Sequence, residues 1–131
     1  MSVGQFVFML HSHLPYYRKA GMWPFGEENL YECMAETYVP LLNAISELYD
    51  EGIKAKLTVG ITPILAEQLN DEHLQNGFVK YIDAQITAVS KDLERYPDPK
   101  VAHSQHLKYL AKYYFDLWNK LRDDFVNKYE K

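Results

Sequence analysis

Apolar residues near the start of the chain form a short run that ends in two histidines. Positions 6–10 read Phe-Val-Phe-Met-Leu and are followed by His11 and His13. A run this short, rich in aromatic residues and bounded by glycine and proline, predicts a buried strand rather than a helix. Side chains alternate along a strand, so one face is expected to carry Val7, Met9, His11 and His13.

From residue 29 the apolar positions repeat with the period of a helix. This pattern runs from Asn29 to Gly52, with Pro40 expected to kink the helix or restart it near Val39 and with Gly52 as the residue that ends the helix. A second strand is predicted from Lys56 to Ile61, closed by the Thr-Pro pair that follows it.

The rest of the chain has helical spacing as well. A helical stretch is expected from Ile64 to Tyr96, broken near Asn70 and again near Gly77, and stopped by Pro97. Another is expected from Val101 to Lys131. The order β-α-β-α-α predicts an α/β fold that opens a right-handed parallel unit without completing it. Two parallel strands cannot cover the apolar faces of so much helix, so we expect the opening part of a larger barrel or sheet.

Composition excludes several classes of protein. The chain has 131 residues, of which 47% are hydrophobic, and a formal net charge of −4. This mixed, mildly acidic composition favours neither nucleic acid nor an anionic membrane as a partner, and no segment is long enough to cross a membrane. Cys33 is the only cysteine, which excludes an internal disulfide and fits a reducing compartment. We therefore expect a cytoplasmic protein.

The two histidines, His11 and His13, fall where parallel α/β folds bind their ligands, at the carboxyl end of a strand. Three interpretations are open: hydrogen-bonded structural residues, metal ligands of a metal-dependent hydrolase, or hydrogen-bonding partners of a substrate. A metal site needs more ligands, and the other histidines fall within predicted helices, at His73, His103 and His106. We expect no bound metal and no cofactor.

The loop after the first strand is rich in aromatic residues. Aromatic side chains make up 15% of the chain, and several of them lie in this loop outside any helical pattern: Tyr16, Tyr17, Trp23 and Phe25. Sugar rings stack on aromatic faces, so Trp23 and Tyr16 are candidates for binding a carbohydrate. The alternative is that Trp23 anchors the loop to the rim of the fold.

The charged residues of this region have simple structural explanations. Arg18 is expected to pair with Glu27 or Glu28, which fall where the N-terminus of a helix favours negative charge. Helix capping and solvation are also expected to explain the other acidic residues nearby, Glu32, Glu36 and Glu67. The sequence offers no carboxylate pair placed for joint catalysis.

Four stretches of sequence, in this order, resemble a known family of enzymes. They are His11–Tyr16 with Arg18, Trp23–Glu28, Glu36–Leu42 and Thr62–Leu69. The chain resembles glycoside hydrolase family 57 and, within it, the 1,4-α-glucan branching enzymes. The resemblance implies an incomplete seven-stranded (β/α) barrel followed by a helical domain. It also implies an enzyme that cleaves α-1,4-glucan and re-attaches the cut chain through an α-1,6 bond.

The same resemblance implies a division of labour within the enzyme. Its retaining mechanism uses a glutamate nucleophile and an aspartate acid/base on strands later than those found here, so residues 1–131 would form a partial catalytic barrel domain with no catalytic residue. The expected substrate-binding residues are His11, His13, Trp23 and Tyr16. Expected partners are α-1,4-glucan and the missing part of the barrel, or a second copy that meets exposed strand edges and helix faces. A metal-dependent hydrolase using the histidine pair, or a non-catalytic carbohydrate-binding or structural remnant, are the alternatives.

Overall fold

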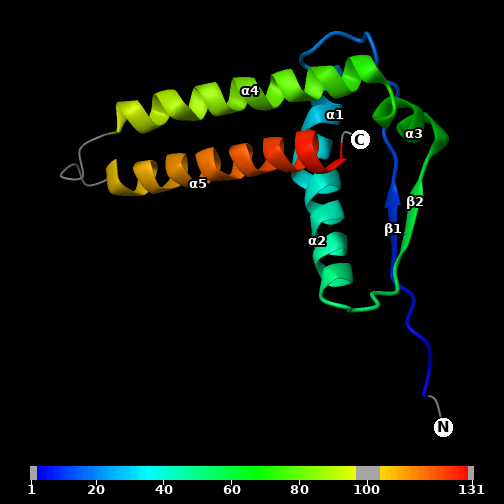
Figure 1. Cartoon of the computed structure of the whole chain (residues 1–131). Coiled ribbons are helices and arrows are strands. Elements are labelled where there is room, and N and C mark those ends of the chain that lie inside the picture. Colours follow the sequence, from blue (N-terminus) through cyan, green and yellow to red (C-terminus); the bar gives the residue numbers. More distant parts are fainter. Residues whose placement is uncertain (1–2, 97–103, 130–131) are drawn as a thin grey trace. The chain divides into compact units, whose positions relative to one another are not determined.

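The computed structural model describes residues 3–96 and 104–129 and divides into two compact units, residues 1–75 and 76–131. Figure 1 shows the elements in chain order. Unit 1 contains β1 (Met9–Ser12), α1 (Glu27–Cys33), the π-helical turn η1 (Met34–Tyr38), α2 (Val39–Asp50), β2 (Thr58–Ile61), α3 (Pro63–Leu69) and the first turn of α4 (Glu72–Arg95). Unit 2 contains the rest of α4, then α5 (Ser104–Asp123) and the π-helical turn η2 (Asp124–Tyr129).

The two strands form a parallel pair, as the sequence predicts. Met9 is paired with Thr58, and the register continues to Ser12 opposite Ile61. The expected boundaries are wrong by a few residues, because β1 begins at Met9 instead of Phe6 and continues to Ser12. The pairing begins at Thr58, where β2 begins, so the chain before Met9 has no partner strand among the described residues.

The expected burial of the first strand is also wrong. Phe6 is 89% exposed and Met9 is 66% exposed. A parallel strand is buried on both faces only when further elements cover it. Within the described part of unit 1, buried apolar side chains come instead from the helices: Leu30, Tyr31, Met34, Ala35, Val39, Leu65 and Leu74.

The helical stretch between the strands runs without a gap from α1 through η1 to α2. The predicted restart near Val39 is confirmed, because η1 ends at Tyr38 and α2 begins at Val39. A proline lacks the backbone N–H and its ring crowds the carbonyl of the preceding turn. The wider π-helical turn accommodates both effects, so the helix continues through the proline. The predicted end is confirmed at Gly52, whose φ is +74°.

The breaks predicted in the second half of the chain are partly confirmed. A break at Asn70–Asp71 separates α3 from α4. The break expected near Gly77 is wrong, since α4 runs through it. One glycine within a helix costs only about 1 kcal/mol, and the next residue, Phe78, is fully buried. The expected stop at Pro97 lies outside the described residues.

Unit 2 is held together by aromatic packing between two long helices. The rings of Phe78 and Phe125 meet edge to face with centroids 4.8 Å apart, and those of Tyr81 and Trp118 do so at 6.0 Å. Such pairs stabilise a core beyond the area they bury. Trp118 is half-buried and packs against Tyr81. No helix in the described ranges is long and apolar enough to span a membrane.

Gly52 provides a direct test of the helix end. Its N–H donates to the carbonyl of Tyr49 and the N–H of Ile53 donates to that of Leu48, which is the Schellman arrangement. Gly52→Ala places a Cβ in the left-handed region, so we expect the free energy of unfolding to fall by about 1–2 kcal/mol. Gly52→Asn should lose less, because asparagine tolerates this conformation. Denaturant titration measures both, and equal stability of Gly52→Ala and wild type would contradict the assignment.

Candidate functional site

One face of the two-stranded sheet packs toward the helices of unit 1. The alternate positions Leu10, Ser12, Val59 and Ile61 line a cavity of about 460 Å³ together with His11, which lies between the first two, and with residues of η1, α2 and α3. At its edge the Ser12 hydroxyl donates a hydrogen bond of 2.6 Å to the Tyr38 hydroxyl oxygen. This contact ties the carboxyl end of β1 to the π-helical turn.

His11 belongs to the opposite face of the sheet. It is paired in register with Gly60, and a Cβ at Gly60 would lie 3.1 Å from His11 Nδ1. The imidazole therefore lies over Gly60, on the face away from Leu10 and Ser12. In a parallel barrel the face away from the helices is the interior. His13 is exposed and follows immediately after β1, so strand alternation does not fix its direction.

The two candidate aromatic residues lie on the loop after β1 and are accessible. Trp23 is 78% exposed and Tyr16 is 61% exposed. Within the described ranges, no hydrogen bond or ring contact involves the side chains of these residues or of His11 and His13. The structure therefore leaves the predicted binding side chains accessible and does not connect them to one another.

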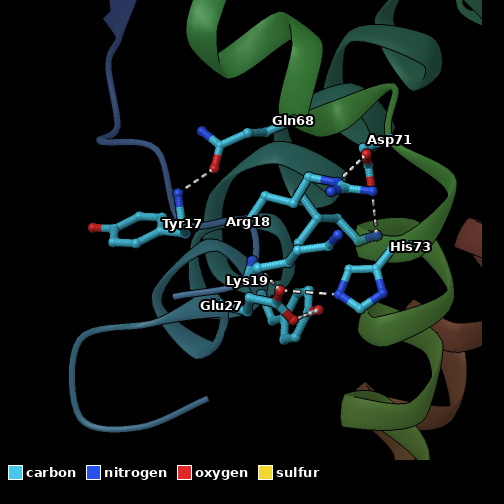
Figure 2. Close-up of polar contacts among 9 residues, drawn as sticks. Tyr17, Arg18, Lys19, Glu27, Gln68, Asp71 and His73 are labelled. Carbon is cyan, nitrogen blue, oxygen red and sulfur yellow. Dashed lines mark hydrogen bonds and ion pairs between the residues drawn. The ribbon is translucent and has the colours of Figure 1, made fainter. Parts of the chain in front are cut away.

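The same loop takes part in a set of polar contacts that the sequence analysis missed. We call it the loop clamp and define it as the side chains of Arg18, Glu27, Gln68, Asp71 and His73 (Figure 2). These residues come from the loop itself, from α1, from α3 and from the start of α4.

Gln68 is the most buried member of the loop clamp, with 1% of its surface exposed. Its Oε1 accepts a hydrogen bond of 2.6 Å from the backbone N–H of Tyr17 (Figure 2). Its Nε2 donates one of 2.9 Å to the backbone carbonyl of Pro15. Both polar groups of a buried amide are thus satisfied by the loop backbone.

Arg18 pairs with Asp71, and not with Glu27 or Glu28 as the sequence suggested. Its Nε donates to Asp71 Oδ2 at 2.5 Å, while Asp71 Oδ1 accepts the backbone N–H of Leu74 at 3.1 Å. Partial burial acts to raise the pKa of Asp71, but the hydrogen bonds from Leu74 and Arg18 outweigh it and lower the pKa. Asp71 therefore caps α4 and holds the loop at the same time.

Glu27 lies in the first turn of α1, as predicted, but it is buried, so the expectation that it is solvated is wrong. It is 7% exposed. Its Oε1 accepts the backbone N–H of Lys19 at 2.8 Å and lies 3.0 Å from His73 Nε2, and its Oε2 accepts the Tyr31 hydroxyl at 3.0 Å (Figure 2). Burial acts to raise the pKa of Glu27, but these hydrogen bonds and the nearby imidazole together lower it.

The loop also approaches the start of α1 through its backbone. A Cβ at Gly26 would lie 2.0 Å from the carbonyl oxygen of Gly21, a distance that no backbone shift of a few tenths of an ångström relieves. The same carbonyl accepts the N–H of Glu27 at 2.8 Å. Glycine at position 26 lets the loop fold onto the helix start.

Only weak local signals could have revealed the loop clamp. Gln68 lies within one of the four stretches that carry the family resemblance, and Asp71 lies at the predicted helix break. Their partners are about fifty residues away in the chain, 51 for Gln68 with Tyr17 and 53 for Arg18 with Asp71. Sequence spacing alone does not reveal such long-range contacts.

Metal-binding groups do not gather in the part of the chain that the structure describes. No three side chains of histidine, cysteine, aspartate or glutamate lie close enough there to hold an ion. His106 is exposed on α5, and His103 lies outside the described residues.

A sequence model of glycosyl hydrolase family 57 matches residues 7–129. The chain therefore belongs to glycosyl hydrolase family 57, which confirms the resemblance carried by its four sequence stretches.

Individual relatives match nearly the whole chain. The 1,4-alpha-glucan branching enzyme TK1436 of Thermococcus kodakarensis is 41% identical over 125 residues, which are 95% of this chain and 18% of that protein. The crystal structure of the GH57-type branching enzyme of Pyrococcus horikoshii aligns with a TM-score of 0.73 at 36% identity, over 92% of this chain and 22% of that one. The alpha-amylase AmyC of Thermotoga maritima aligns with a TM-score of 0.73 at 30% identity, over 91% and 22%. The chain spans about a fifth of the length of these relatives.

Removing the charge of Glu27 tests the loop clamp. Glu27→Gln keeps the size of the side chain but turns one acceptor into a donor that faces other donors. We expect it to lower the free energy of unfolding by about 1–3 kcal/mol. Glu28→Gln is the matched control, because no hydrogen bond or ion pair of its side chain is found among the described residues. Equal losses in the two variants, measured by denaturant titration, would contradict the role given to Glu27.

The pH dependence of stability provides a second, independent test. Because the pKa of Glu27 is lower in the folded chain, the stability it contributes is present above the unfolded pKa and is lost as the pH falls through the folded pKa. The stability difference between wild type and Glu27→Gln should therefore shrink as the pH falls below about 4.5. A difference that keeps growing below that pH would contradict the lowered pKa.

Proposed function

We propose that this chain forms the N-terminal wall of an α-glucan site in a family 57 enzyme of the branching type, as the first portion of an incomplete (β/α) barrel. The observation that carries the proposal is the position of His11. It lies at the carboxyl end of a parallel strand, on the face away from the helices, in a chain that belongs to this family. That end of the strands is where (β/α) barrels bind their ligands.

The exposed side chains suit a sugar surface in complementary ways. A neutral imidazole has one donor and one acceptor nitrogen, so His11 and His13 can hydrogen-bond hydroxyl groups of glucose. Trp23 and Tyr16 offer exposed aromatic faces on which a pyranose ring stacks. Both kinds of contact orient a glucan without a cofactor.

The reacting carboxylates belong, in this proposal, to parts of the enzyme beyond this chain. A retaining glycosidase needs two carboxyl groups about 5–5.5 Å apart across the scissile bond. Glu27 is buried in the loop clamp, while Glu32 and Glu36 are exposed on the outside of helices. The chain would then bind glucan without cleaving it, and the rest of the barrel, or a second copy, would cover the open sheet. We favour branching over amylase action because the chain is 41% identical to the branching enzyme TK1436. A cytoplasmic location stays a prediction.

Binding of maltoheptaose to residues 1–131 tests the function. We expect His13→Ala and Trp23→Ala each to weaken binding about five- to tenfold, the loss of one or two hydrogen bonds or one stacking contact. His106→Ala and Tyr109→Ala are matched controls, since both residues are exposed on α5, and they should bind like the wild type.

Isothermal titration measures these affinities, and melting temperatures establish that the variants are folded. No detectable binding by the folded wild type would overturn the proposal. Uniform affinity across the two site variants and the two controls would overturn the assignment of these residues.

A further inference from the structure

We propose that Gln68 is a positioning residue of the glucan site. From α3 it fixes the backbone of Pro15 and Tyr17 and so sets the direction in which Tyr16, the residue between them, meets the sugar. This inference rests on the proposed function, and it adds a buried residue that touches no substrate.

The contact has the geometry of strand pairing. In an extended segment the carbonyl of the residue before and the N–H of the residue after a given position point to the same side. Gln68 engages these two groups around Tyr16, accepting from Tyr17 at 2.6 Å and donating to Pro15 at 2.9 Å. A two-point contact of this kind fixes both the position and the orientation of the segment between its anchors.

An amide at this position satisfies both loop groups at neutral pH. It carries one acceptor and two donor hydrogens, whereas a carboxylate only accepts and an aliphatic side chain does neither. Gln68 itself is 1% exposed, and its two hydrogen bonds to the loop are part-buried. Loss of the amide therefore removes the partner of two loop backbone groups to which water has restricted access.

Core filling alone does not explain glutamine here. Gln68 lies in α3 close to Leu65, a fully buried residue, and an aliphatic side chain of similar length would bury apolar area without needing hydrogen bonds. Among the residues that the structure describes, both hydrogen bonds of the glutamine amide are to the loop. What it orders is the segment that carries Tyr16, whose own side chain is 61% exposed.

α3 also connects this loop to the sheet. A single residue, Thr62, separates β2 from α3. The N–H of Thr62 donates to the carbonyl of Ser12 at 3.3 Å. Gln68 therefore holds the segment around Tyr16 in position relative to the same strand ends that carry His11. The aromatic residue and the imidazole are held to a common support.

The test compares Gln68→Met with a matched glutamine variant. Gln75 is half-buried and its Nε2 donates to the carbonyl of Leu69 at 2.8 Å, so Gln75→Met removes a side-chain-to-backbone hydrogen bond away from the loop. We expect Gln68→Met to weaken maltoheptaose binding at least fivefold and to speed hydrogen exchange of the Tyr17 amide at least tenfold. Gln75→Met should change neither.

A double-mutant cycle shows whether the effect passes through Tyr16. In a Tyr16→Ala background, Gln68→Met should cause little further loss of binding, because the ring it positions is gone. Full additivity of the two losses would overturn the inference. So would wild-type affinity, or a wild-type exchange rate at Tyr17, in the folded Gln68→Met variant.

Gln68→Glu keeps the test decisive if Gln68→Met does not fold. A protonated carboxyl restores one donor and one acceptor, so the affinity of Gln68→Glu relative to wild type should rise between pH 7 and pH 5. A relative affinity that does not change with pH would overturn the inference. If the wild type itself binds no maltoheptaose, the proposed function fails first. If it binds and Gln68→Met binds equally well, the positioning role alone fails.

Discussion

The buried carboxylate of Glu27 is the constraint on which the organisation of unit 1 depends. A carboxylate removed from water is stable only if hydrogen bonds replace its hydration. Glu27 obtains them from the Lys19 backbone in the loop, from Tyr31 one turn along α1 and from His73 at the start of α4. The hydrogen bonds of this one carboxylate therefore fix the path of the loop and hold the first turns of α1 and α4 together.

Buried polar side chains and exposed side chains have separate roles in this arrangement. The loop clamp uses amide, carboxylate and guanidinium groups that are buried or half-buried and hydrogen-bonded to the loop. The side chains assigned to glucan, with Trp23 and Tyr16 among them, are exposed and have no polar contact to give up among the described residues. A loop backbone that is already held by hydrogen bonds, and that carries side chains without polar partners, keeps the entropic cost of binding low.

The sequence predicted those features that depend on local chemistry. The parallel strands, the helix end at Gly52 and the break at Asn70 follow from strand length, a left-handed glycine and turn residues. The start of β1 and the continuity of α4 through Gly77 depend on partners elsewhere in the fold, and both were mispredicted. The loop clamp was missed for the same reason, since Glu27 and His73 are 46 residues apart in sequence.

The central claim is that the sheet face bearing His11, together with the loop held by the loop clamp, meets α-1,4-glucan. Intermolecular nuclear Overhauser effects between maltoheptaose and the isotope-labelled chain test it most directly. The account predicts contacts from glucose protons to the imidazole of His11 and to the rings of Trp23 and Tyr16. Contacts confined to the exposed aromatic residues of α5, such as Tyr109, would contradict it.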